Sequence, residues 1–93
     1  MTSNEVLSMY EQIAGLTSRM AAAAQAGDMA GMEQLERQCA VASRPAATGV
    51  PALDGAARMR KIDLLKQIMA NDRAVREVTE PWMGQLERVM HTH

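Results

Sequence analysis

The sequence has few of the residues that build β-sheets. Among its 93 residues there is no phenylalanine, and Tyr10 and Trp82 are the only aromatic side chains. Aromatic and β-branched residues favour strands, whereas the alanines, leucines and nine methionines found here favour helices. A chain of this length has room for one small hydrophobic core. We therefore expect a single all-α domain with a thin core.

Cysteine, net charge and long apolar runs are also scarce. The one cysteine, Cys39, cannot form an intrachain disulfide, which is typical of a reducing compartment. The longest apolar run, residues 20–24, is far shorter than the roughly 20 residues of a membrane span. Ten basic and eleven acidic residues give a net charge of -1, so no basic field attracts nucleic acid. We expect a cytoplasmic protein that binds neither membrane nor nucleic acid directly.

The residue types of catalysis and metal binding are not grouped in the sequence. His91 and His93 lie at its carboxyl end, where no rigid frame would hold them. Cys39 has no histidine near it in sequence, so we interpret it as a small buried side chain. No phosphate-binding glycine loop, paired metal-ligand spacing or nucleophile elbow occurs. We expect no enzymatic activity and no metal or cofactor.

Capping and turn signals place two antiparallel helices in the first half of the chain. The segment Thr2-Ser-Asn-Glu5 has the form of a capping box, so a helix should begin beside it. Gly27 can end this helix in the left-handed conformation, and Asp28 can cap the next one. The predicted helices are 3–26 and 28–44.

Apolar and small residues at helical spacing define the inward face of each helix. In the first helix they are Val6, Tyr10, Ile13, Thr17, Met20 and Ala24, widened by Leu7, Ala14 and Ala21. In the second they are Met29, Met32, Leu35, Cys39 and Ala42. We interpret three methionines, Met20, Met32 and Met69, as core fillers between alanine-rich helices.

The second half of the chain predicts a loop and one long helix. Residues 45–54 contain two prolines and a glycine, which is typical of a loop. Apolar residues then keep one helical phase, so we expect a helix over 55–91. Pro81 removes a backbone hydrogen bond within it, so we expect a kink there. The predicted fold is an antiparallel three-helix bundle, with a short helical hairpin packed on the long third helix.

The predicted third helix is longer than the hairpin on which it packs. At about 1.5 Å per residue the three helices span roughly 35 Å, 25 Å and over 50 Å, which leaves the third uncovered from about residue 80 onward. An uncovered apolar stripe is an association surface. We predict that it binds a partner, with Trp82 as the anchor, because large aromatic side chains dominate binding energy. The residues of this surface are Val75, Val78, Trp82, Met83, Leu86, Val89 and Met90.

Two other interpretations stay open at this stage. The uncovered stripe of one chain could cover that of a second copy, making the protein a structural helical adaptor or a homodimeric coiled coil. The basic cluster Arg58-Met-Arg60-Lys61 could bind an acidic partner or nucleic acid. A solvated face is the better interpretation, since only one aromatic residue lies in the same helix and the net charge of the chain is negative.

Five short sequence segments, in their order and spacing along the chain, carry a resemblance to a known family. They are Tyr10-x-x-Ile13-x-x-Leu16, Ala26-Gly27-Asp28, Leu35-Glu36-x-x-Cys39, Ile62-x-x-Leu65-x-x-Ile68-x-x-Asn71-Asp72-x-x-x-Arg76 and Pro81-Trp82-Met83-x-x-Leu86. Together they cover nearly the whole chain and resemble the flagellar export chaperone FliT family.

This resemblance implies a cytoplasmic chaperone that binds the filament-cap protein FliD, prevents its premature assembly and delivers it to the type III export apparatus. It also implies contacts with the flagellar export ATPase complex and, in some members, inhibition of the flagellar master regulator. Longer members carry an additional C-terminal helix that masks the partner-binding surface. The sequence here reaches only His93, so we do not expect that masking.

Overall fold

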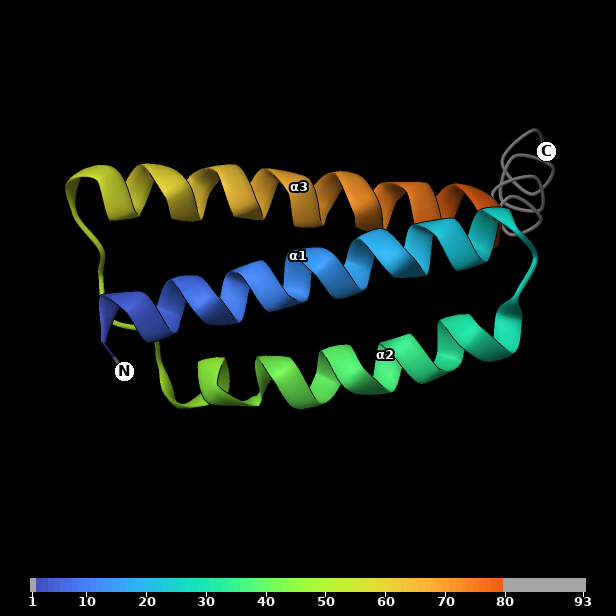
Figure 1. The fold of residues 1–93 in the computed structure, drawn as a ribbon, viewed down its shortest axis with the longest axis horizontal. Helices are drawn as coiled ribbons and strands as arrows, with labels where there is room; N and C mark the ends of the chain where they lie inside the picture. Colours follow the sequence, from blue (N-terminus) through green and yellow to red (C-terminus); the bar gives the residue numbers. More distant parts are fainter. Residues whose placement is uncertain (1, 80–93) are drawn as a thin grey trace, which may run out of the picture.

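The described part of the chain folds as three α-helices, with the first helix in the middle. In a computed structural model, residues 2–79 are described, apart from the side chain of Thr48. The helices are α1 (Ser3–Gln25), α2 (Met29–Ser43) and α3 (Gly55–Thr79). They run up, down and up, so that α3 is parallel to α1 (Figure 1). The all-α prediction is confirmed, and residues 2–79 contain no strand.

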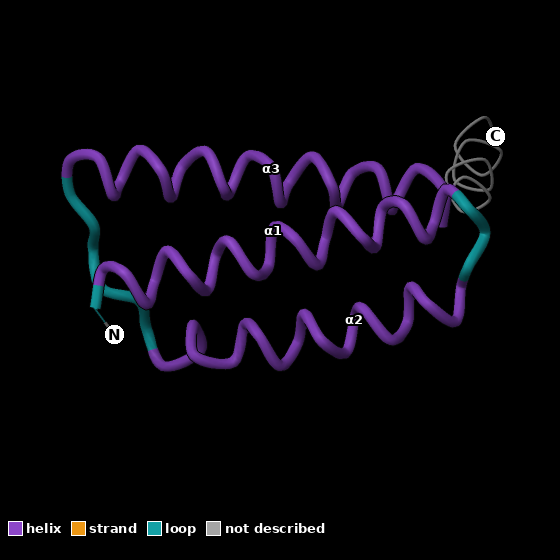
Figure 2. Tube along the Cα trace, viewed as in Figure 1, coloured by secondary structure: helices purple, strands orange, loops and turns teal. Residues whose placement is uncertain are grey.

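Local side-chain chemistry sets the ends of α1 and α2. The backbone N–H of Glu5 donates to Thr2 Oγ1 at 3.2 Å, and the Glu5 carboxylate accepts from the Thr2 N–H, which completes the predicted capping box. Gly27 has a φ of 75° just after α1. Asp28 Oδ1 accepts from the backbone N–H of Gly31 at 3.0 Å and caps α2. The resulting turn is short, and the two helices are antiparallel (Figure 2).

The connection from α2 to α3 is more regular than the loop that the sequence predicts over 45–54. Its first part forms a short 3-10 helix, η1 (Arg44–Thr48). Pro45 fits this turn because its fixed φ suits a helix start and it has no N–H to leave unpaired. In the rest of the connection Leu53 is 7% exposed. The loop therefore contributes an apolar side chain to the core.

The core follows α1 because both other helices pack on it. In the part of the chain that the structure describes, no Cα atom of α2 lies within 8 Å of one in α3. A helix between two neighbours needs two buried faces, whereas the sequence stripe assumed one. The buried residues of α1 are Val6, Met9, Ala14, Leu16, Ala21 and Ala24. The predicted stripe missed Met9 and Leu16 for this reason.

One apolar cluster joins all three helices near the α1–α2 turn. It consists of Ala21 and Ala24 of α1, Met32 of α2 and Val75 of α3. Small alanine side chains let the neighbouring helices approach α1 closely here. Met32 is thus the core filler that the sequence predicts, and Met20 packs against the cluster.

Two methionines lie on the surface, contrary to their predicted inward positions. Met69, predicted as a core filler, is 69% exposed, and Met29, predicted to face the first helix, is also exposed. Met69 lies five residues from Leu64, which at 100° per residue turns it away from the buried side of α3. Met29 is the first residue of α2, directly after the short turn from α1. Both predictions were wrong, because methionine is compatible with either environment.

A polar contact joins α3 to α1 in the middle of the molecule. Asn71 Nδ2 donates to Thr17 Oγ1 at 3.1 Å and lies 3.4 Å from the carbonyl oxygen of Ala14. The Thr17 hydroxyl in turn donates to the same Ala14 carbonyl at 3.1 Å. Apolar contacts alone tolerate sliding of one helix along another. This directional contact fixes the register of α3 on α1.

Candidate partner-binding surfaces

The predicted partner-binding stripe begins at the end of α3. Val75 is 7% exposed and packs in the core cluster, whereas Val78 is 39% exposed. The stripe therefore changes from buried to accessible within one helical turn, close to the end of α1 (Figure 1). The other predicted residues, Trp82, Met83, Leu86, Val89 and Met90, lie outside the described residues. The kink expected at Pro81 lies outside them as well.

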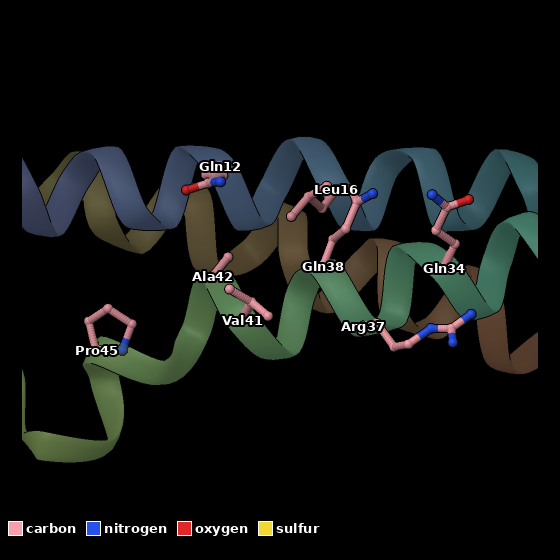
Figure 3. Close-up of a pocket in the computed structure, with 8 residues that line it drawn as sticks. All are labelled: Gln12, Leu16, Gln34, Arg37, Gln38, Val41, Ala42 and Pro45. Atoms are coloured by element: carbon pink, nitrogen blue, oxygen red, sulfur yellow. The ribbon is translucent and has the colours of Figure 1, made fainter.

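A groove of about 680 Å³ runs between α1 and α2 (Figure 3). Its apolar part includes the buried Leu16 of α1 and the exposed Val41 of α2. The side chains of Gln34 and Gln38 extend from α2 toward α1 (Figure 3). The lining residues are Gln12, Leu16, Gln34, Arg37, Gln38, Val41, Ala42 and Pro45.

The groove continues toward the start of α1. A second hollow of about 380 Å³ shares Gln12, Ala42 and Pro45 with the first. Amide side chains supply three of the eight residues that line the first hollow and two of the seven that line the second, and amides donate and accept hydrogen bonds without acting as acids or bases. The chemistry of the groove therefore suits a peptide backbone or an amphipathic helix better than a reacting substrate.

The sequence did not indicate this groove, although a signal for it exists. Residues of α2 at positions 34, 38, 41 and 42 follow one another at helical spacing. Three of those positions carry polar or weakly apolar side chains, so the stripe does not stand out by hydrophobicity. The signal for the groove is therefore a second face of α2 that repeats at helical spacing but is not apolar.

Cys39 lies between α2 and α1, beside Met20. Its Sγ is 3.6 Å from the Sδ of Met20. Burial raises the pKa of the Cys39 thiol, and the nearby Glu36 carboxylate raises it further. A thiol that stays protonated is a weak nucleophile. Cys39 therefore contributes packing between the two helices, although it is half-buried and not the buried side chain that the sequence predicts.

Two ion pairs lie at the surface of the part of the chain that the structure describes. Arg60 lies 3.7 Å from Glu11, and Arg76 lies 3.1 Å from Asp72. No cluster of three or more histidine, cysteine, aspartate or glutamate side chains within residues 2–79 could hold a metal ion. In that same range, no helix has the length and apolarity of a membrane span. The described residues define the class of protein: a small bundle of three helices with an open groove between α1 and α2.

Comparison with known families gives the particular family. The family model described as flagellar protein FliT matches residues 7–93. The chain belongs to this family, which confirms the resemblance seen in the sequence. The family is one of flagellar export chaperones. No curated protein and no solved structure matches the chain.

Proposed function

We propose that this chain is a cytoplasmic chaperone that binds the filament-cap protein FliD, prevents its premature assembly and delivers it to the flagellar export apparatus. The family match over residues 7–93 is the observation that carries this proposal. The fold supports it in physical terms, because three helices packed around α1 leave apolar and amide surfaces open to a helical partner.

The client surface in this proposal is the stripe that continues from Val75. The exposure of Val78 shows that this face of α3 is accessible at its described end. Trp82, Met83, Leu86, Val89 and Met90 follow at helical spacing in the sequence. A client helix lays its apolar face along such a stripe and excludes water from it. Burial of roughly 800 Å² per partner is ordinary for a stable complex.

Binding of the C-terminal segment of FliD, measured by titration calorimetry, tests this function and its surface. Trp82→Ala should weaken binding by about 30-fold, because an aromatic anchor contributes about 2 kcal/mol or more. Helix content measured by circular dichroism should stay the same. Val41→Ala, which alters the α1–α2 groove, is the control and should leave the affinity unchanged.

Two outcomes of this titration contradict the proposal. If the unaltered chain does not bind FliD at low salt, the chaperone function is wrong. If Val41→Ala weakens binding and Trp82→Ala does not, the client occupies the α1–α2 groove and the proposed surface is wrong.

We further propose that the complex with FliD is handed to the flagellar export ATPase complex. A contact with the flagellar master regulator would add a role in flagellar gene expression. Both partners follow from the family alone.

The second candidate function is a structural adaptor that pairs with its own copy. The exposed Val78 favours it to the same extent, since a second chain could cover the same stripe. Sedimentation equilibrium separates the two functions. An obligate dimer that does not bind FliD would support the adaptor.

A further inference from the structure

The charges of the described residues are divided unevenly among the helices. α3 carries the cations Arg58, Arg60, Lys61, Lys66, Arg73 and Arg76 and the carboxylates Asp63, Asp72 and Glu77. The remainder of residues 2–79 carries the cations Arg19, Arg37 and Arg44 and the carboxylates Glu5, Glu11, Asp28, Glu33, Glu36 and Asp54. The chain is nearly neutral, but α3 is basic and the α1–α2 hairpin is acidic.

Part of this positive charge lies on the face of α3 that turns away from α1. Leu64 and Val75 mark the side of α3 that is buried. Positions at about 120° to 180° from these two residues around the helix include Met59, Lys66, Met69 and Arg73. We call these four residues, with Arg76 at their edge, the outer stripe; all five are exposed.

The outer stripe combines exposed apolar area with unpaired charge. Met59 is 61% exposed and Met69 is 69% exposed, more than any other large apolar side chain in the part of the chain that the structure describes. Arg76 is paired with Asp72. Within residues 2–79, neither Lys66 nor Arg73 has an ion-pair partner. Exposed methionines suit surfaces that adapt to an apolar partner.

Met69 and Arg73 separate two shallow hollows on this face. The hollow of about 250 Å³ is lined by Met69, Asp72, Arg73 and Arg76. The hollow of about 230 Å³ is lined by Lys66, Met69, Ala70 and Arg73. Hollows on both sides of a protruding side chain can receive side chains from a facing helix, as ridges pack into grooves.

We propose that the outer stripe is a docking site for an acidic amphipathic helix of a protein partner. Lys66 and Arg73 lie seven residues apart, or about 10 Å along the axis, with Met69 between them. A matching helix carries two carboxylates two turns apart and an aliphatic residue between them, in the pattern Glu-x-x-Leu-x-x-x-Glu. The carboxylates pair with Lys66 and Arg73, and the aliphatic side chain packs on Met69.

Nucleic acid fits this face less well than an acidic helix. Proteins that hold single strands stack bases on aromatic side chains, and the outer stripe contains none. The acidic hairpin on the other side of the molecule also repels a long phosphate backbone. An acidic helix can bind along α3 alone, where the net charge is positive.

The outer stripe is separate from the surface proposed for FliD. Val78 lies nine residues after Met69, which places it on the opposite side of the helix at 100° per residue. A chain that holds its client along the Val78 side therefore keeps the outer stripe free for a second partner. The inference holds whether or not FliD is the client.

The proposal is tested by measuring the affinity of the full chain for a labelled peptide, using fluorescence anisotropy. The peptide is an alanine-based helix of about 20 residues that carries the Glu-x-x-Leu-x-x-x-Glu pattern. At low salt this peptide should bind at least about tenfold tighter than the same peptide with glutamine in place of glutamate, and added salt should weaken binding. The double variant Lys66→Glu/Arg73→Glu should lose binding. That variant should instead bind a peptide with lysine at the two positions.

Matched controls separate the docking site from general charge attraction. Arg19→Glu/Arg37→Glu changes the net charge by the same amount but alters α1 and α2, so it should keep the affinity within about twofold. Met69→Ala should weaken binding, whereas Met29→Ala on α2 should not. Circular dichroism should show equal helix content for all variants, since each altered residue is exposed.

Three outcomes would overturn the proposal. The first is failure of the glutamate peptide to bind better than the glutamine peptide. The second is an equal loss of binding in both double variants, which indicates a nonspecific charge effect. The third is tighter binding of a single-stranded oligonucleotide that Lys66→Glu/Arg73→Glu abolishes, which assigns the outer stripe to nucleic acid.

Discussion

At the scale of single residues, Asn71 links α3 to α1 by a hydrogen bond from its side chain. Its amide donates to Thr17 Oγ1 at 3.1 Å from a partly buried position in the stripe of α3 that faces α1. In the sequence, Asn71 lies at helical spacing from Leu64, Ile68 and Val75, which is enough to assign it to that stripe. The sequence could not show the bond partners, because Thr17 lies 54 residues away in the chain.

Asn71→Ala should lower the free energy of unfolding by about 1 kcal/mol, the usual net contribution of a protein hydrogen bond. The Thr17 hydroxyl keeps its bond to the Ala14 carbonyl, so a larger loss is not expected. Urea unfolding followed by circular dichroism measures the change. Asn4→Ala, at an exposed position of α1, is the control and should change stability by less than about 0.5 kcal/mol. Equal effects of the two variants would contradict the role of Asn71.

Cys39 should react slowly with iodoacetamide at neutral pH. Because burial and Glu36 raise the pKa of the thiol above its ordinary value of 9.0, the alkylation rate should still be rising above that pH. In denaturant the same thiol should titrate at its ordinary value. Glu36→Gln should lower the pKa of the native Cys39 thiol part of the way toward its ordinary value. A native thiol that reacts faster than the denatured one would refute this account.

At the scale of elements, the chain shows which features local chemistry determines. The capping box at Thr2 and the turn at Gly27 were predicted because each depends on residues within three or four positions. The 3-10 turn at Pro45 was missed because prolines and a glycine within residues 45–54 are typical of a loop, although proline also fits the first turn of a helix. The burial of Leu53 was missed because it depends on distant residues.

Gly27→Ala should destabilise the hairpin by about 1 kcal/mol. The φ of 75° at this position disfavours residues with a Cβ, although no atom within 4 Å would clash with one. Gly27→Asn should cost less, since asparagine tolerates the left-handed conformation. Thermal unfolding of the two variants tests this order. If Gly27→Ala instead stabilised the protein, the turn would have to adopt another conformation without losing stability, which contradicts this prediction.

At the scale of the whole molecule, the central position of α1 explains both what the sequence predicted and what it did not. The helix order and the up-down-up arrangement follow from the short turn and the periodic stripes. The helix α1 is packed on two sides, and the groove lies on the side that faces α2. A single sequence does not show which faces a central helix shares with each neighbour.

The surface proposed for FliD, which includes Val78, and the proposed outer stripe lie on opposite sides of α3 and differ in chemistry. Val78 continues an apolar face, while Lys66, Met69 and Arg73 form a basic one. An export chaperone must hold its client and still be recognised by other proteins. Two faces on one helix allow both without competition for the same residues.

The fluorescence of Trp82, the only tryptophan in the chain, tests the central claim most directly. If Trp82 anchors the client, the free chain should emit as a water-exposed indole at all protein concentrations. Adding FliD should then shift the emission to shorter wavelength and reach saturation at one equivalent. A free chain that already emits at short wavelength and does not respond to FliD would contradict the chaperone account.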